Sequence, residues 1–250
     1  MAETKIEWTA AADGSPGYSF NPWVGCTKIS PGCDRCYAEG WAKRSGLVAW
    51  GGAPRKTSAE NWRKPMVWQR KAVVSGIRAR VFCASLADVF DNQAEPGWRM
   101  DLWRLIAATP DLDWLLLTKR PQNIRKMLPD GWGDGWPNVW LGSTVEDRER
   151  AAQRLPVLGA TPATVRFISA EPLIEDWSDM LPAALARWRL DWIICGGESG
   201  GGARDMPADW ARRLRDATLA GGSAFFMKQM SRKADIPADL LVRQFPAAAI

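Results

Sequence analysis

Residues 138–172 read NVWLGSTVEDRERAAQRLPVLGATPATVRFISAEP, and this stretch decides the fold. It opens with a run of β-branched and aliphatic residues, passes through a polar helical stretch, and closes with a second run of the first kind. Thr144 and Asp147 form a capping-box-like start for the helical stretch RERAAQRL. A strand, a helix and a strand within about 30 residues are typical of a β/α unit.

The same layout recurs along most of the chain. Strand-like runs begin at Arg80, Asp113, Asn138, Thr164, Asp191 and Ser223. Their starts lie 25 to 33 residues apart, and residues 18–24 form a weaker seventh run. We therefore predict an α/β fold, a TIM-barrel-like barrel of six to seven parallel strands with helices outside, closed or open on one side.

Length and composition favour one domain. The 250 residues are 46% hydrophobic and 24% charged, which suits a single large core over residues 1–250. No stretch reaches the roughly 18 uninterrupted apolar residues of a membrane span, and the first residues lack the layout of a signal peptide. We expect a cytoplasmic protein without a membrane partner.

The sequence contains no histidine. This excludes Ser-His-Asp and Cys-His nucleophile systems, two-His carboxylate iron sites and zinc sites that contain histidine. Acid–base chemistry must come from carboxylates, lysine, tyrosine, thiols or a cofactor. The formal charge of +5 is a mild bias toward anionic partners.

Polar or glycine clusters follow each strand-like run at its carboxyl side. They are Ser85 with Asp88, Thr118-Lys119-Arg120, Ser143-Thr144 with Glu146, Ser169 with Glu171, Gly196-Gly197-Glu198-Ser199, and Lys228-Gln229. The carboxyl ends of parallel strands line the site in such folds. Turns are polar in any protein, but charged ends such as LTKR and FMKQ favour a functional rim. An ion-pair ring with a purely structural role is the alternative.

Three of the five cysteines stand close together in the loop 25–40. Cys26, Cys33 and Cys36 form a C-x6-C-x2-C pattern, with Pro31 and Gly32 allowing the loop to fold back. Three thiolates suit a [4Fe-4S] cluster with one open iron, whereas a closed zinc site needs four ligands. Structural zinc stays an alternative if a fourth ligand comes from elsewhere. Cys83 and Cys195, the other two cysteines, lie inside apolar runs.

Several strings resemble a known family. NPWVGCTKISPGCDRCYAE, LLLTKRP, VWLGSTVED, RFISAEPL, DWIICGGESGGGARDM and FFMKQ occur in this order. Together they resemble the phage-encoded three-Cys-motif family, which is regarded as similar to radical S-adenosylmethionine (radical SAM) enzymes. The resemblance covers nearly the whole chain.

The resemblance implies a mechanism and a cofactor. In radical-SAM enzymes the open iron binds S-adenosylmethionine, and one electron from a donor protein cleaves it to a hydrogen-abstracting radical. The cluster ligands would be the three loop cysteines. The GGE string Gly196, Gly197 and Glu198 resembles the motif whose carboxylate accepts the methionyl amine, and Tyr37 is a further cofactor contact. The first two cysteines of the family's usual motif are spaced C-x3-C, whereas Cys26 and Cys33 are spaced C-x6-C. Arg35 replaces the usual aromatic residue before the last cysteine.

The remaining rim residues are assigned to substrate chemistry. The catalytic candidates are Lys119, Glu146, Glu171 and Lys228. Lys119 and Lys228, together with Arg120 and Arg204, would bind a phosphate or carboxylate. This predicts a small-molecule or nucleotide-like anionic substrate. We expect a radical-SAM-like enzyme, with nucleotide or nucleic-acid modification in a phage setting as the candidate reaction. The alternatives are a zinc- or cluster-stabilised nucleic-acid-binding protein without catalysis, and a barrel enzyme whose Lys/Glu rim works alone.

Overall fold

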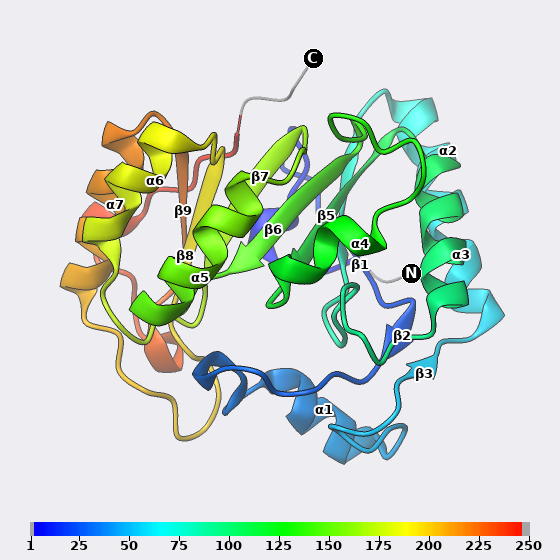
Figure 1. The fold of residues 1–250 in the computed structure, drawn as a ribbon, viewed down its shortest axis with the longest axis horizontal. Helices are drawn as coiled ribbons and strands as arrows, with labels where there is room; N and C mark the ends of the chain where they lie inside the picture. The colour runs from blue at the N-terminus through cyan, green and yellow to red at the C-terminus, as the bar shows by residue number, and fades with distance from the viewer. Residues whose placement is uncertain (1–2, 247–250) are drawn as a thin grey trace.

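The computed structural model describes residues 3–246 and contains one sheet of seven parallel strands (Figure 1). In spatial order they are β1 (Tyr18–Phe20), β4 (Ala79–Cys83), β5 (Leu112–Thr118), β6 (Val139–Thr144), β7 (Val165–Ala170), β8 (Trp192–Gly196) and β9 (Ala224–Gln229). Every neighbouring pair is parallel. Within the described residues β1 and β9 do not pair, so the sheet is a half-barrel open on one side. The predicted fold class is confirmed.

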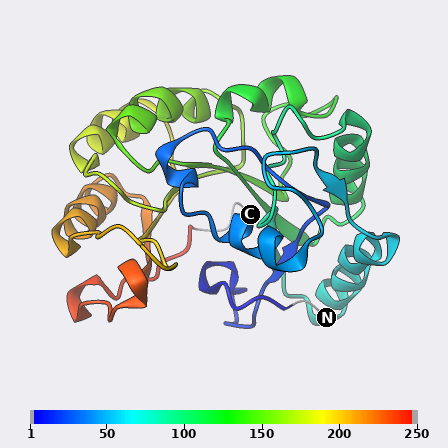
Figure 2. The same cartoon turned by 90° about the horizontal axis from the view of Figure 1, so that it is seen from below.

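Helices cover the outer face of the half-barrel. They are α2 (Ala59–Ser75), α3 (Pro96–Ala107), α4 (Ile124–Met127), α5 (Arg148–Gly159), α6 (Leu181–Arg187) and α7 (Ala208–Ala220). Figure 2 shows them as an arc, with the blue cysteine loop and α1 (Tyr37–Ser45) inside it. The antiparallel pair β2 (Trp23–Val24) and β3 (Arg55–Lys56) flanks this insertion on both sides.

Side chains alternate between the two faces of each strand. On β5, Trp114 and Leu116 join the core between the sheet and the helices, while Leu115 and Leu117 belong to a separate core on the inner face. Both faces are therefore apolar, as is usual for parallel sheets. Because the strands contribute so little polar surface, the polar residues collect at the strand ends.

Trp8 fills the inner face of the half-barrel from the short 3-10 helix Glu7–Thr9. Its ring centroid lies 4.7 Å from Phe82, 6.2 Å from Trp192 and 6.3 Å from Phe167. Phe245 packs on the same Trp192 at 5.4 Å. Segments from opposite ends of the described chain thus complete the core where further strands would close a full barrel.

The start of α5 differs from the predicted capping box. Thr144 is the last residue of β6, and Asp147 itself caps the helix by accepting a 2.8 Å hydrogen bond from the Arg150 amide. The prediction placed the cap three residues too early, because a strand end and a helix cap favour the same small polar residues. No helix among residues 3–246 combines the length and the apolar character needed to cross a membrane.

Candidate functional site

A cavity of about 410 Å³ opens at the carboxyl ends of the strands. Its volume is within the usual range of ligand pockets, about 300–1,000 Å³. Residues at or just after the carboxyl ends of β4 to β9 line it on one side, and the cysteine loop with the first turn of α1 lines it on the other. Most of the predicted rim, though not Ser143, Glu146 or Gly196, therefore shares one cavity with the cysteine loop.

All three loop cysteines line this cavity. Cys33 ends the 3-10 helix Pro31–Cys33 and is buried, while Cys36 is the N-cap residue of α1. Cys26 lies 3.6 Å from the Arg120 guanidinium. Burial raises the pKa of the Cys26 thiol to about 12; Asp88 and Asp91 add to the increase, and Arg120 opposes it.

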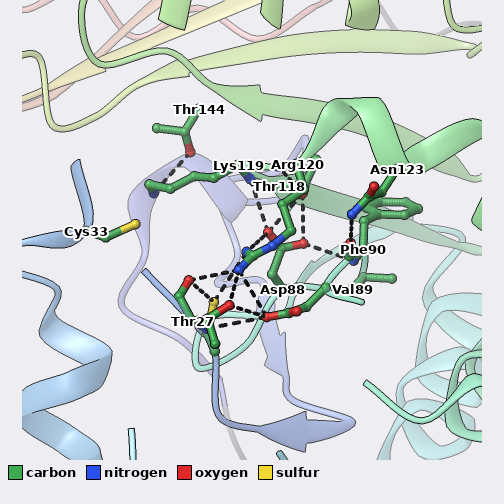
Figure 3. A network of polar contacts seen from close by, with 12 residues as sticks. Thr27, Cys33, Asp88, Val89, Phe90, Thr118, Lys119, Arg120, Asn123 and Thr144 are labelled. Carbon is green, nitrogen blue, oxygen red and sulfur yellow. Dashed lines mark hydrogen bonds and ion pairs between the residues drawn. The ribbon is translucent and has the colours of Figure 1, made fainter. Parts of the chain in front are cut away.

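Arg120 ties the start of the cysteine loop to the end of β5 (Figure 3). Its guanidinium lies between Thr27 and Asp88, donating to the Thr27 carbonyl at 2.8 Å and to Asp88 at 3.1 Å. Asp91 is 3.2 Å away on the other side. Burial alone would lower the pKa of Arg120, but Asp88, Cys26 and Asp91 raise it above its ordinary value. The guanidinium is therefore held charged and in a fixed orientation.

Glu198 ties the middle of the loop to the end of β8. Its carboxylate accepts from the Arg204 amide at 2.7 Å and from Arg35 at 3.3 Å, and it also pairs with the Arg204 guanidinium. Arg204 in turn donates to the Pro31 carbonyl at 2.8 Å. Burial would raise the pKa of Glu198, but hydrogen bonds from Arg204 and Arg35 hold it below its ordinary value. Two guanidinium groups thus already engage the carboxylate predicted to bind an amine.

Tyr37, Lys119, Glu171, Lys228 and Gly197 also line the cavity. The Tyr37 hydroxyl donates to the Ser85 carbonyl at 2.6 Å. Lys228 pairs with Glu171 across the ends of β9 and β7.

Gly196 and Gly197 have different surroundings. Gly196 ends β8 and accepts from the Leu173 amide at 2.9 Å, outside the cavity wall. At Gly197 a Cβ would lie 2.5 Å from the Ser231 hydroxyl. The close approach of residue 231 therefore requires glycine at this point of the wall.

Lys119 differs from the other cations of the cavity. Lys28, Arg35, Arg120 and Lys228 each have a carboxylate partner. Within the described part of the chain, the Lys119 ammonium contacts only the Thr144 hydroxyl, at 3.4 Å. It is the cation of this wall best placed to accept an anionic ligand.

Glu146 lies beneath the cysteine loop and is not part of the cavity wall. The residue is fully buried and its Oε2 accepts from Arg154 at 2.8 Å. A Cβ on Gly32 would come within 3.0 Å of the Glu146 carboxyl group, so the loop rests directly on this side chain. This position does not fit the predicted catalytic contact with a substrate. A fully buried carboxylate supports the loop instead.

The donor set is three thiols from one loop, and that number suits a [4Fe-4S] cluster with one open iron. Residues 3–246 hold no group of three or more Cys, Asp, Glu or His side chains arranged for one metal ion. Cys83 and Cys195 are fully buried in the core on the helix side of the sheet, which removes them as a fourth ligand.

Sequence reasoning missed the residues that hold the loop. Asp91 carried no motif, Thr27 lay in the cysteine motif without a role, and Arg120 was assigned to an anionic ligand although it pairs with protein carboxylates. Asp88 was placed on the rim but given no role. The only available signal was the charge of the LTKR strand end, which indicates a functional position without naming its partner.

A family model matches residues 3–239 and is described as "Protein of unknown function (DUF5131)". The chain belongs to this family. No curated protein matches the sequence of this DUF5131 chain.

Solved structures of spore photoproduct lyase share the fold of this DUF5131 chain. A complex with dinucleoside spore photoproduct aligns with a TM-score of 0.59 at 10% identity, over 91% of this chain and 80% of that one. A mutant with bound AdoMet and the same dinucleoside aligns with a TM-score of 0.57 at 12% identity, over 85% and 76% of the two chains. A third structure, a Tyr-to-Phe mutant, gives 0.58 at 10% identity over 92% and 81%. At these identities the likeness establishes the half-barrel fold.

Proposed function

We propose that this protein is a radical-SAM-like enzyme that holds a [4Fe-4S] cluster on Cys26, Cys33 and Cys36. The observation that carries the proposal is that three thiols from one loop line one cavity at the carboxyl ends of the half-barrel. A protein of the same fold has been solved with AdoMet bound, which supports S-adenosylmethionine as the second cofactor. With both bound, the site would supply reductive cleavage of the sulfonium bond and hence hydrogen abstraction.

The protein's own residues position and shield this chemistry. Arg120, Arg204 and Glu198 fix the loop at two points, so the thiols face the cavity without large rearrangement. The buried Trp8 side chain forms part of the wall and would limit water around a reactive species. Gly197 contributes backbone atoms to the cavity wall, where they could contact the cofactor.

The substrate class follows from the charge of the wall. Lys119 offers an ammonium to an anionic group, and the Glu171–Lys228 pair at the ends of β7 and β9 offers a donor and an acceptor. We assign an anionic, nucleotide-like substrate, and the dinucleoside complexes of the fold relatives support this choice. Nucleic acid is the larger substrate of the same chemistry. The electron would come from a donor protein in the cytoplasm.

The decisive experiment is reconstitution with iron and sulfide without oxygen. The protein should take up one [4Fe-4S] cluster with visible absorption and, after reduction, a paramagnetic signal, and should form 5′-deoxyadenosine from S-adenosylmethionine. Cys26→Ala, Cys33→Ala and Cys36→Ala should each lose the complete cluster because a thiolate ligand is removed. Cys195→Ala is the matched control and should keep it, since its thiol lies in the helix-side core.

Each negative result has a meaning. Stoichiometric zinc that persists after reconstitution, with no 5′-deoxyadenosine, would contradict the enzyme and support the non-catalytic alternative. A cluster that does not bind S-adenosylmethionine would leave a structural or electron-transfer role. Full cluster content in any of the three alanine variants would contradict the ligand assignment.

A further inference from the structure

Arg120 makes a contact that an anchoring role does not require. Its guanidinium is buried, with 5% of the residue exposed, and already has two aspartates and the Thr27 carbonyl as acceptors. Nevertheless Nη1 also lies 3.6 Å from the Cys26 sulfur, within reach of an N–H···S hydrogen bond. Thus one nitrogen serves both Asp88 and a proposed cluster ligand.

The surroundings hold this nitrogen in place. Asp88 accepts from the Thr118 hydroxyl at 2.7 Å and from the Lys119 amide at 3.2 Å, which locks its carboxylate to the end of β5. Asp91 and the Thr27 carbonyl hold the second arm of the guanidinium fork. A planar fork restrained on both arms cannot turn away from Cys26.

A donor aimed at a ligand sulfur influences redox properties. Hydrogen bonds to the sulfur atoms and the charge near an iron–sulfur cluster set its reduction potential. A positive charge and an N–H donor stabilise the more negative, reduced form and raise the potential. A buried carboxylate beside the same sulfur has the opposite effect.

We propose that Arg120 is the positioning residue that presents Cys26 to the cluster and raises the reduction potential of the cluster. Asp88 lowers that potential and so moderates the effect of Arg120. The proposal deepens the proposed function and rests on it. The proposal also assigns separate roles to the two cations of the LTKR strand end. Arg120 acts on the cluster through Cys26, and Lys119 binds the anionic ligand.

The test measures midpoint potentials by anaerobic redox titration of the paramagnetic signal, together with iron and sulfide content. Arg120→Gln should shift the potential to more negative values because the cation and its oriented donor are lost. Asp88→Asn should shift it to more positive values because a buried negative charge beside Cys26 is lost. Opposite signs from two contacting residues cannot arise from general destabilisation.

Arg99→Lys is the matched control. Arg99 is equally buried, at 7% exposed, and donates to the Val89 and Asp91 carbonyls at 2.8 and 2.9 Å. It therefore holds the same segment through its backbone, and within residues 3–246 its side chain makes no hydrogen bond to a cysteine. This variant should lower the melting temperature and leave the potential unchanged. Arg120→Lys keeps the charge and should give a smaller shift than Arg120→Gln.

The outcomes separate the two proposals. Equal potentials in wild type, Arg120→Gln and Asp88→Asn overturn the inference, even if cluster content falls. Loss of the cluster from both Arg120 variants, with retention in Arg99→Lys, supports the presenting role, and Asp88→Asn then decides the question of potential. A wild-type protein that binds no cluster overturns the proposed function, and the inference with it.

Discussion

At the scale of single residues, Glu198 is a charged side chain that stabilises the cysteine loop through ion pairs. The residue is 8% exposed and its carboxylate meets Arg204 and Arg35. Hydrogen bonds to charged groups contribute about 1.5–3 kcal/mol each when buried, more than exposed ion pairs do. The cysteine loop therefore depends on a carboxylate that follows β8, 163 residues after Arg35.

Glu198→Gln should lower the free energy of unfolding by about 1–3 kcal/mol at neutral pH. The pKa of Glu198 is lower in the folded protein than the ordinary value of 4.5, so its stabilisation is complete above that value. It is lost as the pH falls through the folded value. Urea unfolding of both proteins from about pH 7 to about pH 3 checks this, because the difference should shrink on acidification. A difference that stays constant with pH would show that the charge is not what stabilises the loop.

At the scale of elements, two neighbouring strands pack so closely that one position on β6 has no room for a side chain and must be glycine. Gly142 lies in β6 beside Phe167 of β7, and the two are register partners. A Cβ at position 142 would lie 2.2 Å from the Phe167 ring. The aromatic ring thus occupies the space that a side chain on β6 would fill.

Gly142→Ala should destabilise the protein by about 1–3 kcal/mol, because overpacking forces the ring or the backbone to move. Gly97→Ala in α3 is the control, since no atom lies within 4 Å of its added Cβ. That change should be neutral or stabilise by up to about 1 kcal/mol through helix propensity. Chemical denaturation of the two variants gives the comparison. Equal effects would mean that the Phe167 ring moves aside freely.

The elements were predictable from sequence, and their contacts were not. Apolar runs of strand length reveal themselves locally, so β4 to β9 were expected where they occur. The hold of Arg120 on Cys26 joins residues 94 apart, and that of Arg204 on Pro31 joins residues 173 apart. No local pattern specifies such pairs. Likewise a strand-end glutamate reads the same whether it faces the cavity, as Glu171 does, or lies under a loop, as Glu146 does.

At the scale of the whole molecule, the open side of the half-barrel is finished by the two ends of the described chain. Glu3 forms an antiparallel bridge with Tyr18 of β1, and Arg243 forms one with Phe226 of β9. Arg243 also pairs with Glu7 at 2.9 Å. Exposed sheet edges template pairing with other chains, so these bridges protect both edges.

Trp8→Ala should cost about 3–5 kcal/mol of unfolding free energy, since it removes the ring that fills the inner face. Trp50→Ala is a matched control, because Trp50 lines the same cavity but is only half-buried. Its loss should be clearly smaller in the same thermal or urea unfolding measurement. If both variants lost equal stability, Trp8 would be a wall residue of the cavity and not the centre of the inner core.

The pairing of Glu7 with Arg243 also fixes an order of events during synthesis. These residues lie 236 positions apart, so the first segment cannot form this ion pair until nearly all the described chain has been translated. The cysteine loop likewise cannot contact Arg120 until that residue has been translated, and its contacts with Glu198 and Arg204 form later still. Its thiols are therefore synthesised early and enclosed late, so they stay accessible while the chain is still growing.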